Sequence, residues 1–196
     1  MCLANIRVGF ALTGSYCTLA EIMPLLKSLV AEGAEVYPIV SQSVNELTTK
    51  YGSAKQWKDM LEEITGKPVI NTIVKAEPIG PGKMLDVMVV APCTGNTLAK
   101  LANGVVDGPV LMAAKAQLRN QRPVILAIST NDGLGMNAKN IGLLLNMKNI
   151  YLVPFGQDDP QEKPNSLKAK MDLLPATILT ALQGRQYQPL LVTYPV

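Results

Sequence analysis

Short runs of apolar residues alternate along the chain with longer segments whose apolar residues recur at the 3.6-residue spacing of a helix. The runs that predict strands are Arg7–Leu12, Glu35–Val40, Val69–Val74, Val87–Ala91, Val124–Ile128 and Ile150–Pro154. The segments that predict helices are Cys17–Ala31, Ala54–Thr65, Thr97–Ala102, Val110–Asn120, Leu134–Met147 and Ser166–Leu182. Alternation of this kind is typical of βαβ units. The pattern therefore predicts an α/β fold, a doubly wound, Rossmann-like parallel sheet with helices on both faces.

The length of the chain favours a single domain over residues 1–196. A chain of 196 residues falls in the usual range of about 100–200 residues for one domain. No internal repeat, low-complexity tract or linker divides it. Two loops rich in turn-forming residues, Glu77–Lys83 and Gly156–Pro164, are places where ligand or partner contacts could be added.

Composition narrows the functional classes. Charged residues make up 17% of the chain, fewer than the roughly 25% of soluble proteins, so part of the apolar surface is expected to lie between subunits. The net charge of +3 comes without a basic run, which gives no electrostatic footprint for nucleic acid. The three cysteines form no CxxC pair, and neither a signal peptide nor a long apolar segment is present. We expect a cytoplasmic protein with no membrane span, disulfide or metal site.

The loop Thr13-Gly14-Ser15 follows the first predicted strand and opens the first predicted helix. Backbone N–H groups and the helix dipole favour an anion at such a helix start. An ordinary serine-capped helix after a glycine turn explains the same residues. Because the dinucleotide fingerprint GxGxxG is absent, the loop suits a single phosphate better than a pyrophosphate.

Two further segments end predicted strands with small polar residues. Ser41 and Ser43 follow the second strand, where open α/β sheets bind ligands, although a turn or helix cap explains them nearly as well. In the segment DVMVVAPCTGNTLAKLANGVVD, from Asp86 to Asp107, a buried strand ends at Pro92 and a small polar turn opens a helix. Because a generic strand–turn–helix unit would accept many other residues here, this second segment is the most specific pattern in the sequence.

That segment resembles the PASANT-type motif of the homo-oligomeric flavin-containing decarboxylases, a family that includes lantibiotic and phosphopantothenoylcysteine decarboxylases and flavin prenyltransferases. Pro92, Asn96 and Thr97 match the motif directly, while Cys93-Thr94-Gly95 replaces its Ala-Ser-Ala. The start of the chain, VGFALTGSYC, is similar to the family's flavin-phosphate loop. The resemblance covers roughly residues 5–155 and implies a flavoprotein-type fold.

The resemblance implies that the chain binds flavin mononucleotide (FMN). The residues it assigns to the cofactor are Thr13, Gly14, Ser15, Ser41, Ser43, Pro92, Thr94, Gly95, Asn96 and Thr97. Asn131 would face the substrate as the catalytic residue. The family also implies a homo-oligomer, a trimer or a multiple of one.

Departures from the family pattern redirect the expected reaction. The family's active-site histidine would fall near Pro78, but the chain contains no histidine, the commonest general base near neutral pH. The family's Pro-x-Met-Asn turn appears as Ile128-Ser129-Thr130-Asn131, and Leu134 stands where the family has a second methionine. Downstream, Asn140-Ile141 resembles the family's Asn-Ile pair, but the stretch that connects it to the turn is about three residues shorter. These changes disfavour cysteine decarboxylation.

Three runs, LTGSYC, PCTGNTLAKLANGVVD and FGQDDPQEKPNSL, resemble family members that form one subunit of a two-subunit oxidoreductase. This resemblance implies a partner protein with a nicotinamide-binding domain and a small dicarboxylate substrate. Two alternatives remain: a non-catalytic partner that has kept the fold, and a stand-alone decarboxylase or prenyltransferase.

Other residues whose side chains could react or bind a ligand receive weaker interpretations. Cys17 and Cys93 lack a histidine partner, and free cysteine is most often a small buried hydrophobe. Tyr51 and Trp57 could stack on a ring, but one aromatic residue on an amphipathic helix more often packs in the core. Substrate carboxylates need cations, for which Lys83 and Lys100 are weak candidates. Lys100 is more readily explained as a solvated helix residue.

Overall fold

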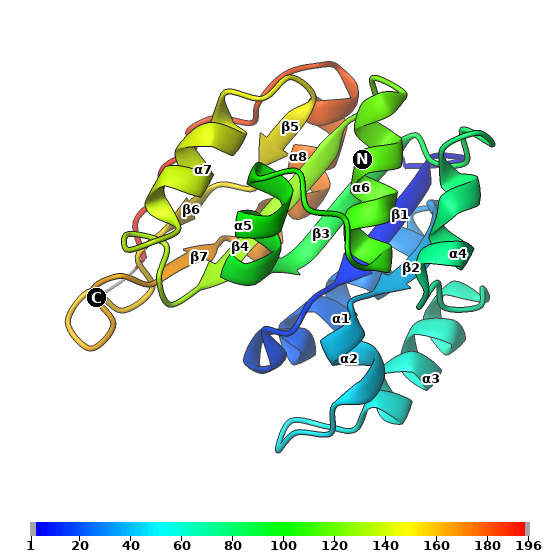
Figure 1. Ribbon diagram of the computed structural model, residues 1–196, viewed down its shortest axis with the longest axis horizontal. Helices are drawn as coiled ribbons and strands as arrows, with labels where there is room; N and C mark the ends of the chain where they lie inside the picture. The colour runs from blue at the N-terminus through cyan, green and yellow to red at the C-terminus, as the bar shows by residue number, and fades with distance from the viewer. Residues whose placement is uncertain (1–2, 195–196) are drawn as a thin grey trace.

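A seven-stranded sheet forms the centre of the computed structural model, which describes residues 3–194 (Figure 1). The strands are β1 (Arg7–Leu12), β2 (Glu35–Val40), β3 (Val87–Cys93), β4 (Val124–Thr130), β5 (Ile150–Leu152), β6 (Phe155–Gly156) and β7 (Leu167–Ala169). The first five pair in parallel in the order β2-β1-β3-β4-β5. Near its end, β4 pairs instead with β7, which runs antiparallel to it and to β6. The predicted α/β fold with a parallel sheet is confirmed.

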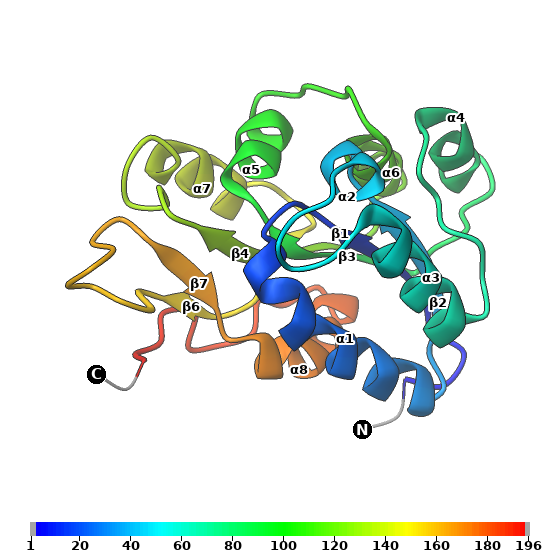
Figure 2. The same ribbon diagram turned by 90° about the horizontal axis from the view of Figure 1, so that it is seen from below.

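Helices cover both faces of this sheet (Figure 2). On one face lie α1 (Tyr16–Ala31) and α8 (Leu174–Leu182), and on the other lie α4 (Ile73–Ala76), α5 (Gly95–Ala102), α6 (Pro109–Arg119) and α7 (Ala138–Leu145). Beside β2 lie α2 (Gln42–Glu46) and α3 (Ala54–Thr65), and short 3-10 turns occupy Glu77–Ile79 and Met171–Leu173. Among the described residues, no helix has both the length and the apolar character to cross a membrane.

The central strands are buried because helices cover them from both sides. Every residue of β3 is buried, and only Arg7 of β1 and Thr130 of β4 are partly exposed. Phe10 and Met88 are fully buried within this core. The continuous apolar runs in the sequence therefore correspond to the interior of the sheet, as expected for parallel strands covered on two faces.

The predicted strand Val69–Val74 is wrong. Only Ile70 pairs with the sheet, through a parallel bridge to Ile39. The Thr72 side chain then accepts a hydrogen bond from Lys75 N and caps α4, so the chain turns away from the β2 edge.

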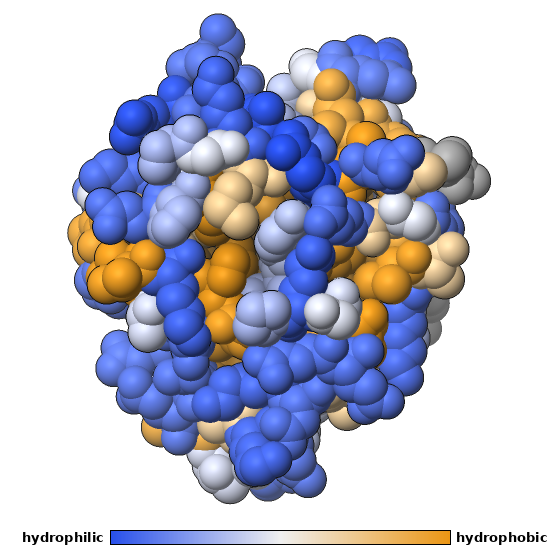
Figure 3. All heavy atoms as spheres, turned by 90° about the vertical axis from the view of Figure 1, so that its right-hand side faces the viewer, coloured by the Kyte–Doolittle hydropathy of each residue, from blue (hydrophilic) through white to orange (hydrophobic). Residues whose placement is uncertain are grey.

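The molecular face that carries α3 and α4 is mostly hydrophilic, with apolar side chains gathered in a hollow (Figure 3).

Two predicted helices are shorter than the sequence pattern indicates. The helix expected over Leu134–Met147 forms only as α7, because the segment before it turns back through hydrogen bonds from Gly135 N and Asn137 N to Asp132 O. The helix expected over Ser166–Leu182 begins only at Leu174. Its first part instead forms β7, which completes the sheet beside β4. Pro175, in the first turn of α8, was the sequence signal for this later start.

At the edge of the sheet where the parallel strands begin, Asp86 links the start of β1 to the residues just before β4. Its carboxylate accepts hydrogen bonds from Arg7 Nη2 at 2.6 Å and Arg7 Nε at 3.0 Å, and Arg122 Nη1 lies 3.4 Å away. Hydrogen bonding from Arg7 lowers the pKa of Asp86 below 3.8, its ordinary value, against the opposing effect of partial burial.

Replacing Asp86 with asparagine is expected to lower the free energy of unfolding by about 1–3 kcal/mol at pH 7. Because the pKa of Asp86 is lower in the folded state, its contribution is complete above the unfolded-state pKa near 3.8 and is lost as pH falls through the folded-state value. Urea unfolding from pH 7 to pH 3 should show the two proteins converging on the acid side. Asp59→Asn, which breaks an exposed pair with Lys55, is the control and should cost at most about 0.5 kcal/mol. An equal loss at pH 7 and pH 3 would contradict the assignment.

Candidate functional site

The site lies at the point in the sheet where the order of successive strands reverses. From β1 the chain crosses to β2 on one side, and from β3 it crosses to β4 on the other, so the loops after β1 and β3 separate. Open α/β sheets bind ligands in the crevice at such a point, outside the carboxyl ends of the strands. The loops that start α1, α2 and α5 all lie at this edge. They contain most of the residues that the sequence assigns to the cofactor.

Thr13 ties the loops after β1 and β3 together. Its buried hydroxyl donates a hydrogen bond to Pro92 O at 2.6 Å and accepts one from Thr94 N at 3.0 Å. Pro92 is also buried and follows a cis peptide bond from Ala91. Because the proton of the Thr13 hydroxyl is already donated within the protein, that side chain positions the two loops. Neither Thr13 nor Pro92 lines either of the two cavities described below.

Ser15 precedes α1, but its side chain makes no capping hydrogen bond, so the interpretation of Ser15 as a side-chain cap is wrong. Its Oγ instead lies 2.8 Å from Ser129 Oγ and 3.3 Å from Thr18 Oγ1. These three hydroxyls join the start of α1 to the end of β4, since Thr18 and Ser129 are also 3.1 Å apart.

Ser41 and Ser43 bring the loop after β2 to the loop after β1. Ser41 caps α2 by accepting from Val44 N at 3.5 Å, which confirms the capping alternative, and its Oγ lies 3.0 Å from Ser43 Oγ. A Cβ atom on Gly14 would stand 2.9 Å from Ser43 Oγ. Gly14 therefore leaves the space through which the Ser43 hydroxyl reaches the first loop.

The turn after β3 is capped by Thr94, whose Oγ1 accepts from Thr97 N at 3.4 Å and lies 3.1 Å from Thr97 Oγ1. Gly95 begins α5 against side chains from the β4–α7 connection. A Cβ atom on Gly95 would lie 2.6–2.7 Å from side-chain atoms of Thr130, Asp132 and Asn137. The close approach of these polar side chains requires glycine at this position.

Two cavities adjoin across the Gly14–Ser43 and Thr94–Thr97 pairs. The smaller cavity, of about 350 Å³, is lined by Ser41, Gln42, Ser43, Glu46, Leu47, Asn96, Thr97, Lys100, Asp107, Gly108, Pro109, Val110 and Leu111. The larger cavity, of about 660 Å³, is lined by Gly14, Ser15, Tyr16, Cys17, Thr18, Tyr51, Thr94, Gly95, Ser129, Thr130, Asn131, Asp132, Asp158, Lys163, Ser166, Leu167 and Lys168. Apart from Thr13 and Pro92, every predicted site residue lines one of these cavities.

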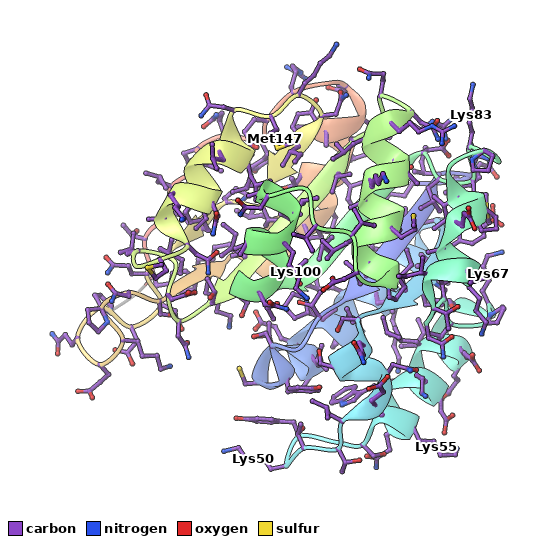
Figure 4. All side chains as sticks on the ribbon, in the orientation of Figure 1. Lys50, Lys55, Lys67, Lys83, Lys100 and Met147 are labelled. Atoms are coloured by element: carbon purple, nitrogen blue, oxygen red, sulfur yellow. The ribbon has the colours of Figure 1, made fainter. Side chains whose placement is uncertain are left out.

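The cations of the site differ from the lysines considered in the sequence. Lys83 lies at the edge of the molecule, away from Lys100 (Figure 4), and lines neither cavity. Lys100 lines the smaller cavity but pairs with Asp107 at 2.6 Å. The larger cavity instead contains Lys163 and Lys168, both from the β6–β7 hairpin.

Sequence reasoning missed the β6–β7 hairpin lysines, together with Ser129 and Asp132. The turn-rich loop Gly156–Pro164, which the sequence indicates as a place for ligand contacts, contains Lys163. Ser129 and Asp132 flank the predicted catalytic Asn131, which is exposed in the larger cavity. The signal for these two residues was their position at the carboxyl end of a buried strand.

The cysteines and aromatic residues take the roles that their burial dictates. Burial raises the pKa of the Cys93 thiol well above its ordinary value, so it remains protonated inside the core. Cys17 is exposed in the first turn of α1 and lines the larger cavity.

Trp57 is buried on α3, whereas Tyr51 is half-exposed at the larger cavity. Desolvation raises the pKa of Tyr16, whose hydroxyl donates to Ser43 O at 2.7 Å.

The donor groups of this edge fit a phosphate. The hydroxyls of Ser41 and Ser43 lie 3.0 Å apart, and Ser15 directly precedes α1, a helix of 16 residues whose dipole favours an anion. Gly14 leaves space between the first loop and the Ser43 hydroxyl. Neither loop, Thr13–Ser15 or Ser41–Ser43, contains a carboxylate that would repel the phosphate.

Fold and site together define a class of protein. The flavoprotein family matches residues 1–174, and the chain belongs to that family. It is 55% identical over 186 residues to the dipicolinate synthase subunit designated B of Bacillus subtilis (strain 168), with 95% of this chain and 93% of the relative covered. The crystal structure of the dipicolinate synthase subunit with the same designation from Bacillus halodurans has a TM-score of 0.91 to this chain. The two are 52% identical, with 98% of this chain and 99% of that chain covered.

A more distant solved structure is a dodecameric FMN-dependent UbiX-like decarboxylase from Escherichia coli O157:H7. Its TM-score is 0.61 at 25% identity, and the similarity covers 76% of this chain and 80% of that one. The family that the PASANT-type segment indicates is therefore confirmed by the family match.

Proposed function

We propose that this chain binds FMN, with the phosphate held by Gly14, Ser15, Ser41 and Ser43. The single observation that supports this most is the approach of Ser43 Oγ to Gly14, which brings the loops after β1 and β2 together beside the start of α1. The turn from Thr94 to Thr97 then lines the ribityl chain or the ring. The hydrogen bond from the Thr13 hydroxyl to Pro92 O holds the loops after β1 and β3 together.

We further propose that the chain is the flavoprotein subunit of a cytoplasmic dipicolinate synthase that acts during bacterial sporulation. Its relatives of more than 50% identity share that enzyme name. The partner is the other subunit of dipicolinate synthase, which contributes a nicotinamide-binding domain and is called the nicotinamide-binding partner below. The reaction oxidises a dihydrodipicolinate-type precursor to dipicolinate. FMN, when bound, supplies a two-electron acceptor.

The residues of this chain contribute binding and orientation to that reaction. The larger cavity presents Lys163 and Lys168 to the carboxylates of a small dicarboxylate. Lys168 Nζ is held 2.7 Å from Glu21, which fixes its position, whereas Lys163 forms no ion pair among residues 3–194. Asn131 offers an amide to the substrate from the carboxyl end of β4.

The phosphate contacts predict a difference between FMN and riboflavin, which lacks the phosphate. The wild-type chain should bind FMN more tightly than riboflavin, and Ser43→Ala should weaken FMN binding about tenfold or more because a hydrogen bond to a charged group is lost. Riboflavin binding should change little. Flavin fluorescence titration measures both affinities. Ser28→Ala, on the exposed side of α1, is the control and should bind both ligands as the wild type does.

Equal affinity of the wild-type chain for FMN and riboflavin would contradict the phosphate site. The reaction is tested separately by co-expressing the chain with its nicotinamide-binding partner, then measuring bound flavin and dipicolinate formation together. Loss of dipicolinate formation when this chain is omitted is the expected result. Unchanged formation by the nicotinamide-binding partner alone would refute the catalytic role.

One observation favours a second candidate function, a non-catalytic protein that stabilises the nicotinamide-binding partner. The chain has no histidine, so the commonest proton-transfer group is missing. That function predicts a colourless chain that takes up no FMN and still raises the thermal stability of the nicotinamide-binding partner. A stand-alone decarboxylase or prenyltransferase would instead require turnover by the chain alone.

We also propose a homo-oligomer, a trimer or a multiple of one. Large apolar side chains are exposed along α7 and its flanking turns, namely Leu134, Met136, Leu143, Leu145 and Met147. The Escherichia coli relative is described as dodecameric. Light scattering of the purified chain should give a mass of three subunits or more, and a monomer mass would refute the proposal.

A further inference from the structure

Asp132 is fixed at the wall of the larger cavity by hydrogen bonds to both of its carboxylate oxygens. Its Oδ1 accepts from the Thr130 hydroxyl at 2.5 Å, and its Oδ2 accepts from Asn137 Nδ2 at 2.8 Å. An ionised carboxylate offers roughly four lone-pair sites on its two oxygens, so these two hydrogen bonds orient the group and leave each oxygen able to accept again.

The hydrogen bonds continue from Asp132 into the protein. Asn140 Nδ2 donates to Asn137 Oδ1 at 2.9 Å, and Asn103 Nδ2 donates to Asn140 Oδ1 at 3.4 Å. The side chains of Asn137 and Asn140 are almost fully buried, at 5% and 4% exposure. A buried network whose members are all paired holds its side chains in one arrangement. Asp132 is therefore a rigid group at the cavity end of a chain of amides that runs through the buried Asn137 and Asn140.

Space for this carboxylate is provided by Gly95, because a Cβ atom there would lie 2.7 Å from Asp132 Oδ1. The main-chain oxygen of Asp132 is also used, accepting from Gly135 N at 3.0 Å and Asn137 N at 3.2 Å. Both the side chain and the backbone of Asp132 are thus fixed relative to β4 and α5.

Other polar groups around the larger cavity are held differently. Asp158 accepts one side-chain hydrogen bond, from Ser166 at 2.7 Å, and both residues belong to the β6–β7 hairpin. The hydroxyls of Ser15 and Ser129 bond to each other, and Lys168 pairs with Glu21. Asp132 is the carboxylate lining this cavity that has side-chain donors on both oxygens.

We propose that Asp132 is a catalytic residue that accepts the substrate proton when a dihydropyridine dicarboxylate is oxidised. This inference rests on the proposed function of the larger cavity. Conversion to the aromatic ring removes two hydrogens. One leaves a ring carbon with both bonding electrons, for which the flavin, held by Gly14, Ser15, Ser41 and Ser43, would supply a two-electron acceptor. The other leaves as a proton to an oxygen of Asp132, and its bonding electrons complete the aromatic ring.

The proposal is tested with Asp132→Asn in the complex with the nicotinamide-binding partner, and Asp159→Asn is the matched control. Asp159 belongs to the β6–β7 hairpin but lines neither cavity, and its replacement makes the same change in charge. Loss of a general base should lower kcat by about 100- to 10,000-fold, without raising the KM for the dicarboxylate. Asp159→Asn should keep kcat within a few-fold of wild type, and Asp132→Glu should restore part of the loss.

A binding measurement separates this role from a structural one. Titrating pyridine-2,6-dicarboxylate into the full chain by calorimetry should show tighter binding to Asp132→Asn than to wild type, because a negative charge facing the anion is removed. Unchanged or weaker binding, or equal loss of kcat in both variants, would overturn the proposal. A wild-type complex that binds the dicarboxylate but forms none would refute the proposed reaction. The titration would still show whether Asp132 faces the ligand.

Discussion

Thr13→Val is expected to lower the free energy of unfolding by about 2–6 kcal/mol, because the buried Pro92 O and the part-buried Thr94 N lose their partner and each loss costs about 1–3 kcal/mol. The buried Thr13 hydroxyl serves both Pro92 O and Thr94 N. Valine has nearly the same shape, so the change removes hydrogen bonds without opening a cavity. The measured loss would then report on the polar link alone.

The same substitution should weaken FMN binding, because the loops after β1 and β3 are held together by this hydroxyl. Urea unfolding gives the stability, and fluorescence titration gives the affinity. Thr48→Val is a suitable control, since Thr48 is exposed in the loop after α2. It should leave both values within about 0.5 kcal/mol of wild type. If Thr13→Val behaves like this control, the two loops do not depend on the Thr13 link.

Gly95→Ala should reduce both stability and dipicolinate formation. The added methyl group would stand 2.6–2.7 Å from polar atoms of Thr130, Asp132 and Asn137. These atoms are side-chain ends, but they bond to one another, so displacing them breaks the network. Overpacking costs about 1–3 kcal/mol, which exceeds the gain of roughly 0.5–1 kcal/mol from replacing glycine within a helix.

Gly142→Ala is the matched control, because Gly142 lies within α7 and nothing approaches the position of its Cβ within 4 Å. There the helical preference acts alone, and a gain of about 0.5–1 kcal/mol is expected. Thermal unfolding should therefore separate the two alanine variants in opposite directions, and the dipicolinate assay should show a loss only in Gly95→Ala. A Gly95→Ala protein as stable and active as wild type would show that the network relaxes freely.

The sequence predicts the parts of the fold in which local pattern and burial agree. Arg7–Leu12, Glu35–Val40 and Ala54–Thr65 form with the expected bounds. The errors arise where tertiary contacts decide. Ile70 contributes one bridge instead of a strand, and Leu167–Ala169 pairs with β4 although its segment has a helical pattern. Propensity and periodicity do not contain those long-range pairings.

The candidate site was predictable as a set of loops but not as a geometry. The motif residues lie at one edge of the sheet, as expected for loops after parallel strands. However, Thr13 and Pro92 are separated by 79 positions, and no local pattern indicates that a hydroxyl joins them. The role of Asp132 depends on Gly95 and Asn137, which lie on different elements. Such three-way contacts exist only in the folded chain.

The β6–β7 hairpin also bears on how the cavity could change in size. The pairing of Phe155 with Ala169 brings the two ends of the hairpin together at the sheet. The entropic cost of closing a loop rises only slowly with its length. Residues inserted between Asp159 and Lys163 would therefore lengthen the cavity wall while leaving the five parallel strands paired. The hairpin is a segment whose length can be varied, in relatives or by engineering, to alter which ligands fit without changing the fold.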